Sequence, residues 1–286
     1  TNAIFGAISG AASSAVGALG LIFIPRLQDH GYSRGYAVTL VALTAVLSLL
    51  IPPSLSMIIF GVLTHLPITV LFLTTVGPGL ILMMLFIVVN YVLTRSMPEV
   101  HVEPKLPVKE YVKSNVISFK NALWGLFMPL IILGGIYGGF FTPTEAACVA
   151  VLYCIPVGFF VYKSFTIKNV VRGFIDTGTI TASIIIVFFF LFIFSRIFIV
   201  EDIPEQMINM LTSFTTNPGT IFIILTLFLV FLGMIMDDTS ALVIAAIIIY
   251  PVAVNFGMDP RQFAALAGVG TGMGLITPPV APTLYM

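Results

Sequence analysis

Long apolar runs alternate with short polar stretches along the whole chain. Most of the runs approach or exceed the about 20 residues that a helix needs to cross a bilayer. The pattern predicts helical segments over residues 4–25, 36–64, 68–94, 121–141, 146–162, 174–200, 219–236, 241–256 and 262–286. A polar stretch at 95–120, whose second part is compatible with a surface helix, separates two halves. Residues 201–218 form a second polar connection that contains an amphipathic piece.

Four interruptions divide these apolar segments. Two of them are proline pairs, Pro52-Pro53 followed by Ser54 and Pro278-Pro279 preceded by Thr277. Proline removes a backbone donor and clashes with the preceding turn, so each pair predicts a split helix. The other two are hairpin-like breaks rich in small and hydroxyl residues: Ser9, Gly10, Ser13 and Ser14 in one, and Asp237, Asp238, Thr239 and Ser240 in the other.

The interruptions recur because one stretch of the chain appears twice. Residues 6–54 align with residues 232–280 at a constant offset of 226 residues. This alignment superposes Ser14 on Ser240, Pro25 on Pro251, Gly31 on Gly257, and Pro52-Pro53 on Pro278-Pro279. Paired interruptions at matching places in two halves are the sequence feature that best indicates a transporter's binding site.

Composition places the chain in a membrane. Hydrophobic residues make up 59% of the chain and charged residues only 8%, with a mean hydropathy of +1.13. Soluble domains carry roughly a quarter charged residues, so this chain lacks the polar surface to meet water all round. A net charge of +0 and the lack of a basic, aromatic-rich patch argue against nucleic-acid binding. Cys148 and Cys154 have no further ligand-type partners and predict no metal site.

The basic residues predict the orientation of the segments. Loops 26–35, 95–120 and 163–172 hold ten of the twelve Lys and Arg residues, which makes their side cytoplasmic. The two copies then enter the membrane from opposite sides and form an inverted repeat. We therefore divide the chain into a first repeat (1–94), a cytoplasmic linker (95–120) and a second repeat (121–286). An apolar beginning at Thr1, and an end at Met286 shortly after a helix break, predict a piece of a longer protein.

The breaks are where chemistry is expected. Broken helices expose carbonyl groups that can bind a hard cation such as Na⁺, and amide groups that can hold a carboxylate. A carboxylate inside an apolar run is a functional candidate, and we assign a cation-ligand role to Asp237 ahead of Asp238. The alternative is that one of them caps the next helix or lies in interfacial water. In the first repeat, Ala11 and Ala12 stand at the positions of Asp237 and Asp238. A cation site at each hairpin would therefore carry a different charge.

Three further features have simpler interpretations. Thr142, Pro143 and Glu145 fit a capping box at a helix start. The glycines at 134, 135, 138 and 139 form two overlapping GxxxG patterns, which favour close helix packing. The triplet at Asp176 resembles that of soluble aspartic proteases, but it lies next to the basic cytoplasmic loop, at the wrong depth to pair with Asp237 across two helices.

Several motifs, in order along the chain, resemble the large membrane subunit of tripartite ATP-independent periplasmic transporters. They are the FGAISG stretch at 5–10, Ile51-Pro52-Pro53-Ser54 with Phe60-Gly61 after it, the segment 134–147 that contains FTPTEAA, Leu232-Gly233-Met234 leading to Asp237, and Gly274-Leu275-Ile276-Thr277-Pro278-Pro279-Val280. The resemblance covers essentially the whole chain. It implies an all-α polytopic membrane protein with inverted repeats, re-entrant hairpins and broken helices, and an elevator-type motion.

The resemblance also implies a function. Members import organic acids with sodium across the bacterial inner membrane, together with a small membrane subunit and a periplasmic substrate-binding protein. Carried over to this chain, it implies no enzymatic activity and no cofactor besides Na⁺ as coupling ion. The implied sodium-binding residues are Ser9, Gly10, Ser14, Pro52, Asp237, Thr239, Ser240, Gly272 and Thr277. The implied substrate-binding residues are Ser13, Ser54, Thr271 and Pro278.

The chain departs from the family pattern within these regions. It reads Gly270-Thr271-Gly272-Met273-Gly274 where many members carry Asn-Leu-x-Ile-Gly, and Ala281-Pro282-Thr283 where Gly-Leu-Asn is usual. The first hairpin has Ala11-Ala12-Ser13-Ser14 in place of a Ser-Ser-Val-Ala-Thr-like run. The carboxylate that is carried is therefore not assigned. Three other functions remain as alternatives to a large transporter subunit. They are a sodium- or proton-coupled anion permease that works without a binding protein, an intramembrane aspartyl protease, and a channel.

Overall fold

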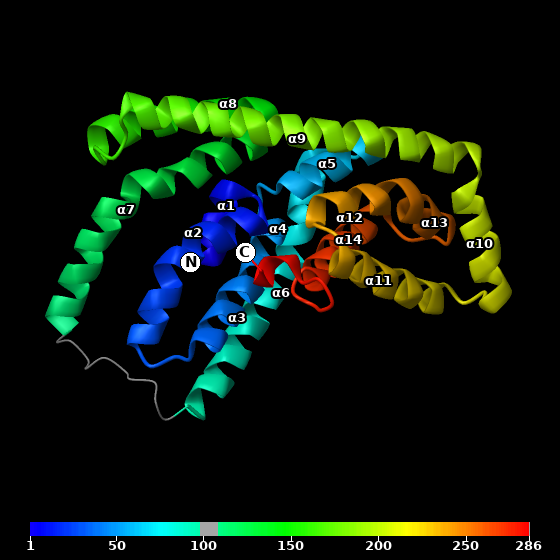
Figure 1. Ribbon diagram of the computed structural model, residues 1–286, viewed down its shortest axis with the longest axis horizontal. Coiled ribbons are helices and arrows are strands. Elements are labelled where there is room, and N and C mark those ends of the chain that lie inside the picture. Colours follow the sequence, from blue (N-terminus) through cyan, green and yellow to red (C-terminus); the bar gives the residue numbers. More distant parts are fainter. Residues whose placement is uncertain (98–107, 286) are drawn as a thin grey trace. The chain divides into compact units, whose positions relative to one another are not determined.

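The described residues fold as helices joined by short turns. The computed structural model describes residues 1–97 and 108–285, and no strand occurs among them (Figure 1). Six helices in this part are long and apolar enough to cross a membrane. The prediction of an all-α polytopic membrane protein is thus confirmed. The chain forms two compact units, one made of Thr1–Glu103 with Asp202–Met286 and the other of Pro104–Glu201.

The first unit contains both copies of the repeat. The first copy and the two helices after it comprise α1 (Asn2–Ser9), α2 (Ala12–Asp29), α3 (Arg34–Ala45), α4 (Leu47–Leu50), α5 (Leu55–Thr64) and α6 (Ile68–Arg95). The second copy and the helix before it comprise α10 (Ile203–Phe214), α11 (Pro218–Ile235), α12 (Asp238–Ile244), the π-helical turn η2 (Ala245–Ile249), α13 (Tyr250–Asn255), α14 (Pro260–Gly274) and the 3₁₀ turn η3 (Pro282–Leu284).

The two copies break at matching positions. The turn between α1 and α2 is Gly10 and Ala11, and the turn between α11 and α12 is Met236 and Asp237, at the 226-residue offset of the alignment. Both proline pairs, Pro52-Pro53 and Pro278-Pro279, interrupt a helix and are joined by cis peptide bonds. The predicted hairpin breaks and split helices are therefore present in the structure.

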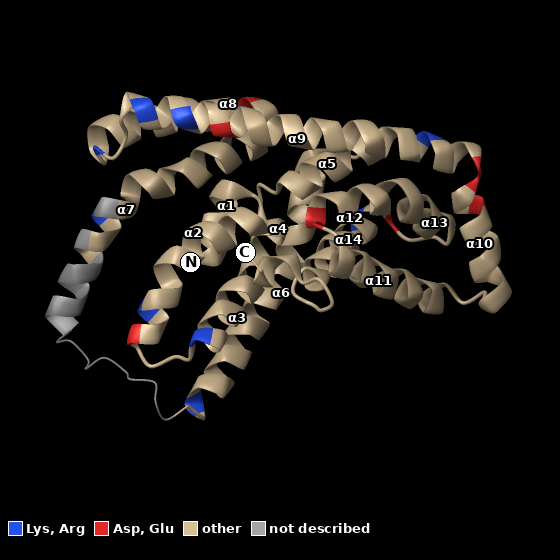
Figure 2. Cartoon of the chain, viewed as in Figure 1, with Lys and Arg blue, Asp and Glu red and all other residues tan. Residues whose placement is uncertain are grey.

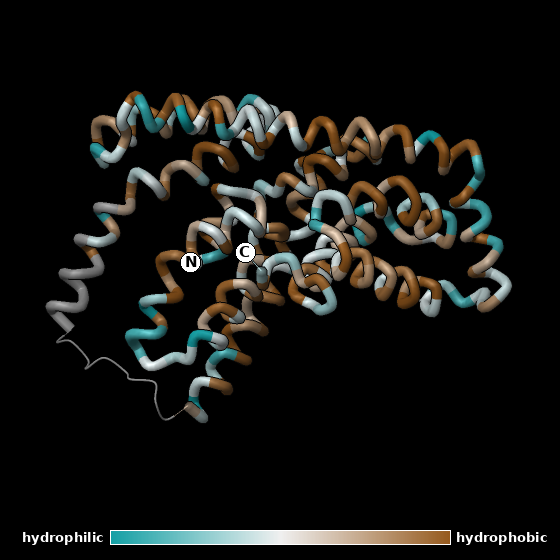
Figure 3. The backbone as a smooth tube through the Cα atoms, viewed as in Figure 1, coloured by the Kyte–Doolittle hydropathy of each residue, from teal (hydrophilic) through white to brown (hydrophobic). Residues whose placement is uncertain are grey.

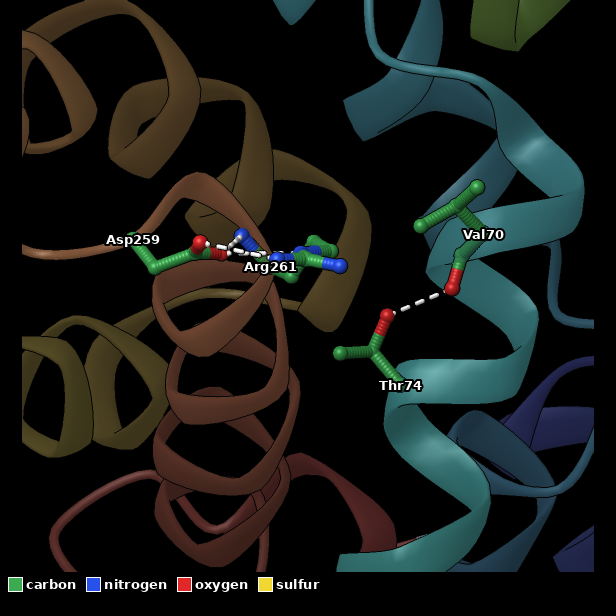
Figure 4. Close-up of polar contacts among 4 residues, drawn as sticks. All are labelled: Val70, Thr74, Asp259 and Arg261. Carbon is green, nitrogen blue, oxygen red and sulfur yellow. Dashed lines mark hydrogen bonds and ion pairs between the residues drawn. The ribbon is translucent and has the colours of Figure 1, made fainter.

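The turns that precede α3 and α14 also match. Gly31 and Gly257 have φ angles of 89° and 86°, a region that suits glycine because it has no Cβ. Ser33 then caps α3 and Asp259 caps α14, each accepting a backbone N–H two or three residues later. Figure 4 shows Asp259 also receiving the Arg261 guanidinium, with both N···O distances at 3.1 Å. These hydrogen bonds from Arg261 hold the pKa of Asp259 below its usual value.

The glycine-rich helix α14 lies at the centre of the first unit and is largely buried. Its glycines allow close contacts on two faces of the helix. A Cβ at Gly268 or Gly272 would meet Met57 or Val46 of the first repeat, at 2.8 and 2.7 Å. A Cβ at Gly274 would lie 2.4 Å from the Val230 carbonyl oxygen on α11. Alternating glycines thus let α14 approach its own repeat on one side and the other repeat on the opposite side.

An aromatic cluster adds a second contact between the repeats. The Phe60 ring of α5 lies 5.9 Å from Tyr250 of α13 and 6.0 Å from Phe263 of α14, measured between ring centroids. Tyr250 and Phe263 are 5.7 Å apart. Phe60 and Phe263 are fully buried, so the cluster closes the core at this end of the split helix.

The second unit contains α7 (Val108–Tyr137), α8 (Pro143–Pro156), the π-helical turn η1 (Val157–Val161) and α9 (Ile167–Val200). The predicted capping box is confirmed: Thr142 accepts the Glu145 N–H, and the Glu145 carboxylate accepts the Thr142 N–H. The prediction of close helix packing at the 134–139 glycines is wrong. Gly135 and Gly138 contact Phe140 and Phe141 of the following turn instead of a neighbouring helix.

Some boundaries differ from the prediction, and one prediction lies partly outside the described residues. Helix α7 begins at Val108, inside the polar stretch, and α9 begins at Ile167 instead of 174. Residues 98–107 of the predicted linker lie outside the described part of the chain. The division into repeats at 94 and 120 stays a prediction.

The exposed surfaces suit a lipid environment. None of the 34 residues of α9 is buried, although the helix is strongly apolar. Figure 3 shows hydrophobic residues over most of α6, α9 and α11, with hydrophilic residues toward their ends. In the first unit, basic residues at the ends of α2, α3 and α6 lie at one end of the unit (Figure 2). This arrangement agrees with the predicted cytoplasmic side.

The backbone contact between α11 and α14 gives a test of the core. A Cβ at Gly233 would lie 2.4 Å from the Thr271 carbonyl oxygen, so Gly233→Ala must push the helices apart. We expect it to destabilise the protein by about 1–3 kcal/mol, as overpacking does. Gly17→Ala is the control, because nothing lies within 4 Å of a Cβ there and alanine favours a helix by about 0.5–1 kcal/mol. Thermal unfolding in detergent should show the two melting temperatures moving in opposite directions, and a fall for Gly17→Ala as large as that for Gly233→Ala would contradict the packing.

Candidate functional site

The tip of the first hairpin docks on the first proline break. The Gly10 carbonyl accepts the Leu55 N–H at 3.1 Å, which joins the hairpin turn to the first residue of α5. Gly10 has φ 66°, and a Cβ there would lie 2.7 Å from the Pro53 carbonyl oxygen. Glycine is therefore required twice, by the backbone angle and by the close approach. Of the residues predicted for sodium, Gly10 and Pro52 lie at this junction.

The hydroxyl groups of this hairpin converge on one carbonyl. Ser14 Oγ donates to the Ala11 carbonyl at 3.0 Å, and Ser9 Oγ reaches the same oxygen at 3.5 Å. Ser13 and Ser14 are exposed at the start of α2. Each hydroxyl oxygen keeps lone pairs for a cation or for a substrate N–H. Their predicted roles in binding sodium and substrate stay predictions.

At the second hairpin, Asp237 caps α12. Its carboxylate accepts the N–H groups of Thr239 at 3.1 Å and Ser240 at 3.3 Å, and its side chain is exposed. The structure therefore confirms, for Asp237, the alternative prediction that one of the two aspartates caps the next helix. A capping carboxylate still has free lone pairs, so its role as a cation ligand stays a prediction.

Asp238 makes a polar contact between the repeats. Ser56 Oγ on α5 donates to Asp238 Oδ2 at 2.5 Å, across 182 positions of sequence. This bond ties the second hairpin to the second half of the first split helix. From the sequence, Asp237 was preferred to Asp238 as the cation ligand, and Ser56 was not among the candidate residues. The available signal was that Ser56 lies two residues after Ser54, inside the same broken helix.

The matching contact in the other repeat is apolar. Ala12 takes the place of Asp238 at the offset of 226 residues. It is buried in a cluster with Ala45, Leu49 and Leu275, the last of which begins the second break. Helix α2 thus starts in an apolar cluster that joins Leu49 of its own repeat to Leu275 of the other, whereas α12 starts with a carboxylate bonded to Ser56.

The second proline break docks on its own hairpin. The Val280 N–H donates to the Met234 carbonyl at 3.3 Å, one position (Val280) and two positions (Met234) before the residues aligned with Leu55 and Gly10. Thr277 Oγ1 donates to the Met273 carbonyl at 2.7 Å, and Thr271 Oγ1 donates to the Ala267 carbonyl at 2.8 Å. Thr271 is fully buried beside Gly233, whereas Pro278 is exposed. The candidate residues of this break therefore differ in their access to a ligand.

Two buried hydroxyls flank the first proline break. Ser54 caps α5, accepting the Met57 N–H at 3.4 Å, and is fully buried. Ser48 is also fully buried, and its Oγ has no hydrogen-bond partner among the described residues. Sequence reasoning missed Ser48, whose counterpart in the second repeat is Gly274. Its Oγ would lie 2.9 Å from a Cβ placed on Gly6 of α1.

The described residues offer only oxygen ligands at these breaks. No group of three His, Cys, Asp or Glu side chains that could hold a metal ion occurs in the described part. Carbonyl, hydroxyl and carboxylate oxygens are the ligands that hard cations prefer. Asp176, the protease alternative, lies in the second unit and pairs with Arg172 at 3.9 Å on an exposed face of α9.

The chain matches one protein family over its full extent. The profile described as tripartite ATP-independent periplasmic transporter, DctM component, matches residues 1–286. The chain is 31% identical over 283 residues to the C4-dicarboxylate TRAP transporter large permease protein DctM of Pseudomonas aeruginosa, covering 99% of this chain and 65% of that protein. It is 31% identical to the sialic acid TRAP transporter large permease protein SiaM of Vibrio cholerae, with the same two coverages.

A third relative is named for a different solute. The chain is 32% identical to the ectoine/5-hydroxyectoine TRAP transporter large permease protein UehC of Ruegeria pomeroyi, over 99% of this chain and 65% of that protein. The chain thus spans about two thirds of the length of these relatives. All three are named as permeases and none as an enzyme, in agreement with the expectation of a non-enzymatic protein.

The bond between Ser56 and Asp238 can be measured by a double-mutant cycle. Ser56→Ala leaves a partly buried carboxylate oxygen without its donor, which we expect to cost about 1–3 kcal/mol of stability. The stability lost by the double variant with Asp238→Ala should be smaller than the sum of the two single losses by about 0.5–3 kcal/mol. Ser183→Ala, which removes an exposed hydroxyl bonded to its own helix, should change little. Additive losses in the cycle would contradict the contact.

The docking of the first hairpin can be separated from the cost of its backbone angle. Gly10→Ala and Gly257→Ala both place a methyl group at positive φ, which costs about 1–2 kcal/mol. Only Gly10→Ala also crowds Pro53, since nothing lies within 4 Å of a Cβ at Gly257. The melting temperature should therefore fall further for Gly10→Ala. Equal losses in thermal unfolding would show that the hairpin does not dock on the proline break.

Proposed function

The chain belongs to the DctM-component family of tripartite ATP-independent periplasmic transporters, and on that premise we propose that it forms the core of a large permease subunit for sodium-coupled import of an organic acid. The proposed route crosses the bacterial inner membrane. The proposed partners are a small membrane subunit and a periplasmic substrate-binding protein. A relative named isethionate TRAP transporter permease protein DctMQ, 29% identical to this chain, supports the pairing with a small membrane subunit.

One observation carries this proposal: the four helix breaks are paired within one unit. Each hairpin is hydrogen-bonded to the proline break of its own repeat, through Gly10 of the turn and Leu55 in one, and through Met234 near the end of α11 and Val280 in the other. Broken helices at membrane depth are tolerated where they line a cavity or are buried in protein. In secondary transporters such breaks carry the substrate and the coupling ion near the midplane.

We assign the coupling ion to the hairpin turns. The exposed Asp237 carboxylate and the Thr239 and Ser240 hydroxyls would bind Na⁺ at the second hairpin, and Ser9, Gly10 and Ser14 would do so at the first. The second site then carries a fixed negative charge that the first lacks. Ser56 fastens the second hairpin through the neighbouring Asp238, so that Asp237 keeps its position at the turn.

The proposed solute is a carboxylate. The helix breaks contain no Lys or Arg side chain that could bind it. Hydroxyl groups at Ser13 and Ser54, the residues Thr271 and Pro278, and bound Na⁺ would meet its negative charge. In the elevator motion proposed for this chain, the hairpins and split helices would move together. Their shared hydrogen bonds and the glycine contacts of α14 would keep them as one body.

The proposal is tested first by sodium. Purified complete protein is unfolded thermally in NaCl and in KCl at equal ionic strength. A ligand that binds only the folded state stabilises it by about 2.7 kcal/mol at 100 times its Kd, so Na⁺ should raise the melting temperature. Asp237→Asn keeps a good capping residue but removes the charge, and should reduce this rise. Asp259→Asn removes the charge of another capping residue and should leave the rise unchanged.

Uptake into proteoliposomes then tests the transport itself. The complete protein, its small membrane subunit and its binding protein should accumulate a carboxylate only with an inward Na⁺ gradient. Accumulation without the binding protein would favour the independent anion permease. Flux that ignores the gradient would favour a channel, and equal melting temperatures in the two salts would overturn sodium coupling.

A further inference from the structure

An apolar crevice lies between α3 and α6 in the first unit. Its volume is about 200 Å³. Tyr36, Leu40, Leu43, Phe86, Val89 and Leu93 form most of its walls, and Thr39, Thr44 and Asn90 also line it. Enclosed apolar cavities of about 150 Å³ stay dry and bind hydrocarbon. Since aliphatic and aromatic side chains make up most of this lining, the crevice suits an apolar chain better than the proposed carboxylate.

The crevice opens beside exposed apolar residues of α6. Val89 and Leu93 lie at its edge on α6 and are 51% and 45% exposed. Both α3 and α6 belong to segments long and apolar enough to span a membrane. The crevice adjoins a cavity of about 310 Å³, with which it shares Leu40, Thr44, Phe86 and Asn90. An apolar chain lying along α6 therefore meets the crevice at Val89 and Leu93.

Aromatic and polar groups form the outer rim of the crevice. Tyr36 donates its hydroxyl to Asn90 Oδ1 at 2.8 Å, which ties α3 to α6. Tyr32 stacks on Tyr36, with ring centroids 5.6 Å apart. Tyrosine at the end of a spanning helix is typical of the level of the lipid headgroups. The apolar crevice therefore ends in a rim of interfacial character.

Two arginines lie beyond the rim. Arg34 is the first residue of α3, and Arg95 is the last residue of α6, where its guanidinium lies 5.8 Å from the centre of the Tyr91 ring. Within the described residues neither forms an ion pair with an acidic side chain. Asp29, at the end of α2, is the acidic residue of the neighbouring helix end, and Arg26 lies on its last turn. Figure 2 shows these basic helix ends at the same end of the unit.

We propose that this crevice binds one acyl chain of an anionic phospholipid, with the headgroup between Arg34 and Arg95. The chain would lie along Leu40, Leu43 and Phe86, and the glycerol region would meet the Tyr36 rim. Basic residues next to a membrane attract anionic lipids of the cytoplasmic leaflet. The excess of positive charge assigns this end to that leaflet. The charge of the rim selects an anionic lipid over a zwitterionic one, and the apolar crevice selects a lipid over a soluble anion.

Native mass spectrometry of the complete protein tests this proposal. The protein, purified in a mild detergent, is titrated with phosphatidylglycerol and separately with phosphatidylcholine, and the retained lipids are counted. Val89→Trp fills the crevice and should abolish one tightly retained phosphatidylglycerol. Leu85→Trp is the matched control, because Leu85 is a comparably exposed residue of α6 (54% against 51%) that does not line the crevice. It should keep that lipid.

A second pair of variants tests the headgroup and does not alter the packing. The double variant Arg34→Gln with Arg95→Gln should weaken phosphatidylglycerol binding by about 30-fold, since each basic residue near the surface contributes about fivefold. Lys163→Gln with Lys168→Gln removes the same charge in the second unit and should have little effect. Equal lipid retention by Val89→Trp and Leu85→Trp, or no preference for phosphatidylglycerol in the unchanged protein, would overturn the proposal.

Discussion

A helix break at membrane depth leaves main-chain donors and acceptors that lipid cannot satisfy, and this constraint governs the first unit. The protein meets it by setting the breaks against one another. The Gly10 carbonyl receives the Leu55 N–H, and the Met234 carbonyl receives the Val280 N–H. A hairpin and a split helix of the same repeat therefore complete each other. Neither would be satisfied alone in hydrocarbon, which explains why the interruptions occur in matching pairs.

This pairing requires backbones to touch, and glycine makes the contact possible. Gly6 packs on Ser48, and Gly233 packs on Thr271 at distances that leave no room for a Cβ. On α14 the glycines alternate between two neighbours, one in each repeat. Small residues replace hydrophobic driving force with close packing, as is usual between helices in lipid. Ser48, which stands where the second repeat has Gly274, has a buried hydroxyl with no hydrogen-bond partner among the described residues.

Local features could be predicted from the sequence, and distant ones could not. The split helices at the proline pairs, the Thr142 capping box and the hairpin turns depend on residues close together in the sequence, so their predicted positions were correct. The bond between Ser56 and Asp238 joins residues 182 positions apart, and choosing between two adjacent aspartates requires the orientation of the helix start. The 134–139 glycines were misinterpreted because a GxxxG pattern needs a facing helix, and Phe140 and Phe141 fill that space. The apolar crevice, which depends on how α3 and α6 splay, left no sequence signal.

The difference between Asp238 and its counterpart Ala12 makes the two halves respond unequally to hydration. Water that reaches the second hairpin competes for the Asp238 carboxylate and loosens its bond to Ser56. Water that approaches Ala12 and Leu275 instead raises the tendency of these side chains to stay together. The exchange of a methyl group for a carboxylate therefore makes the two hairpins differ in how their contacts respond to water.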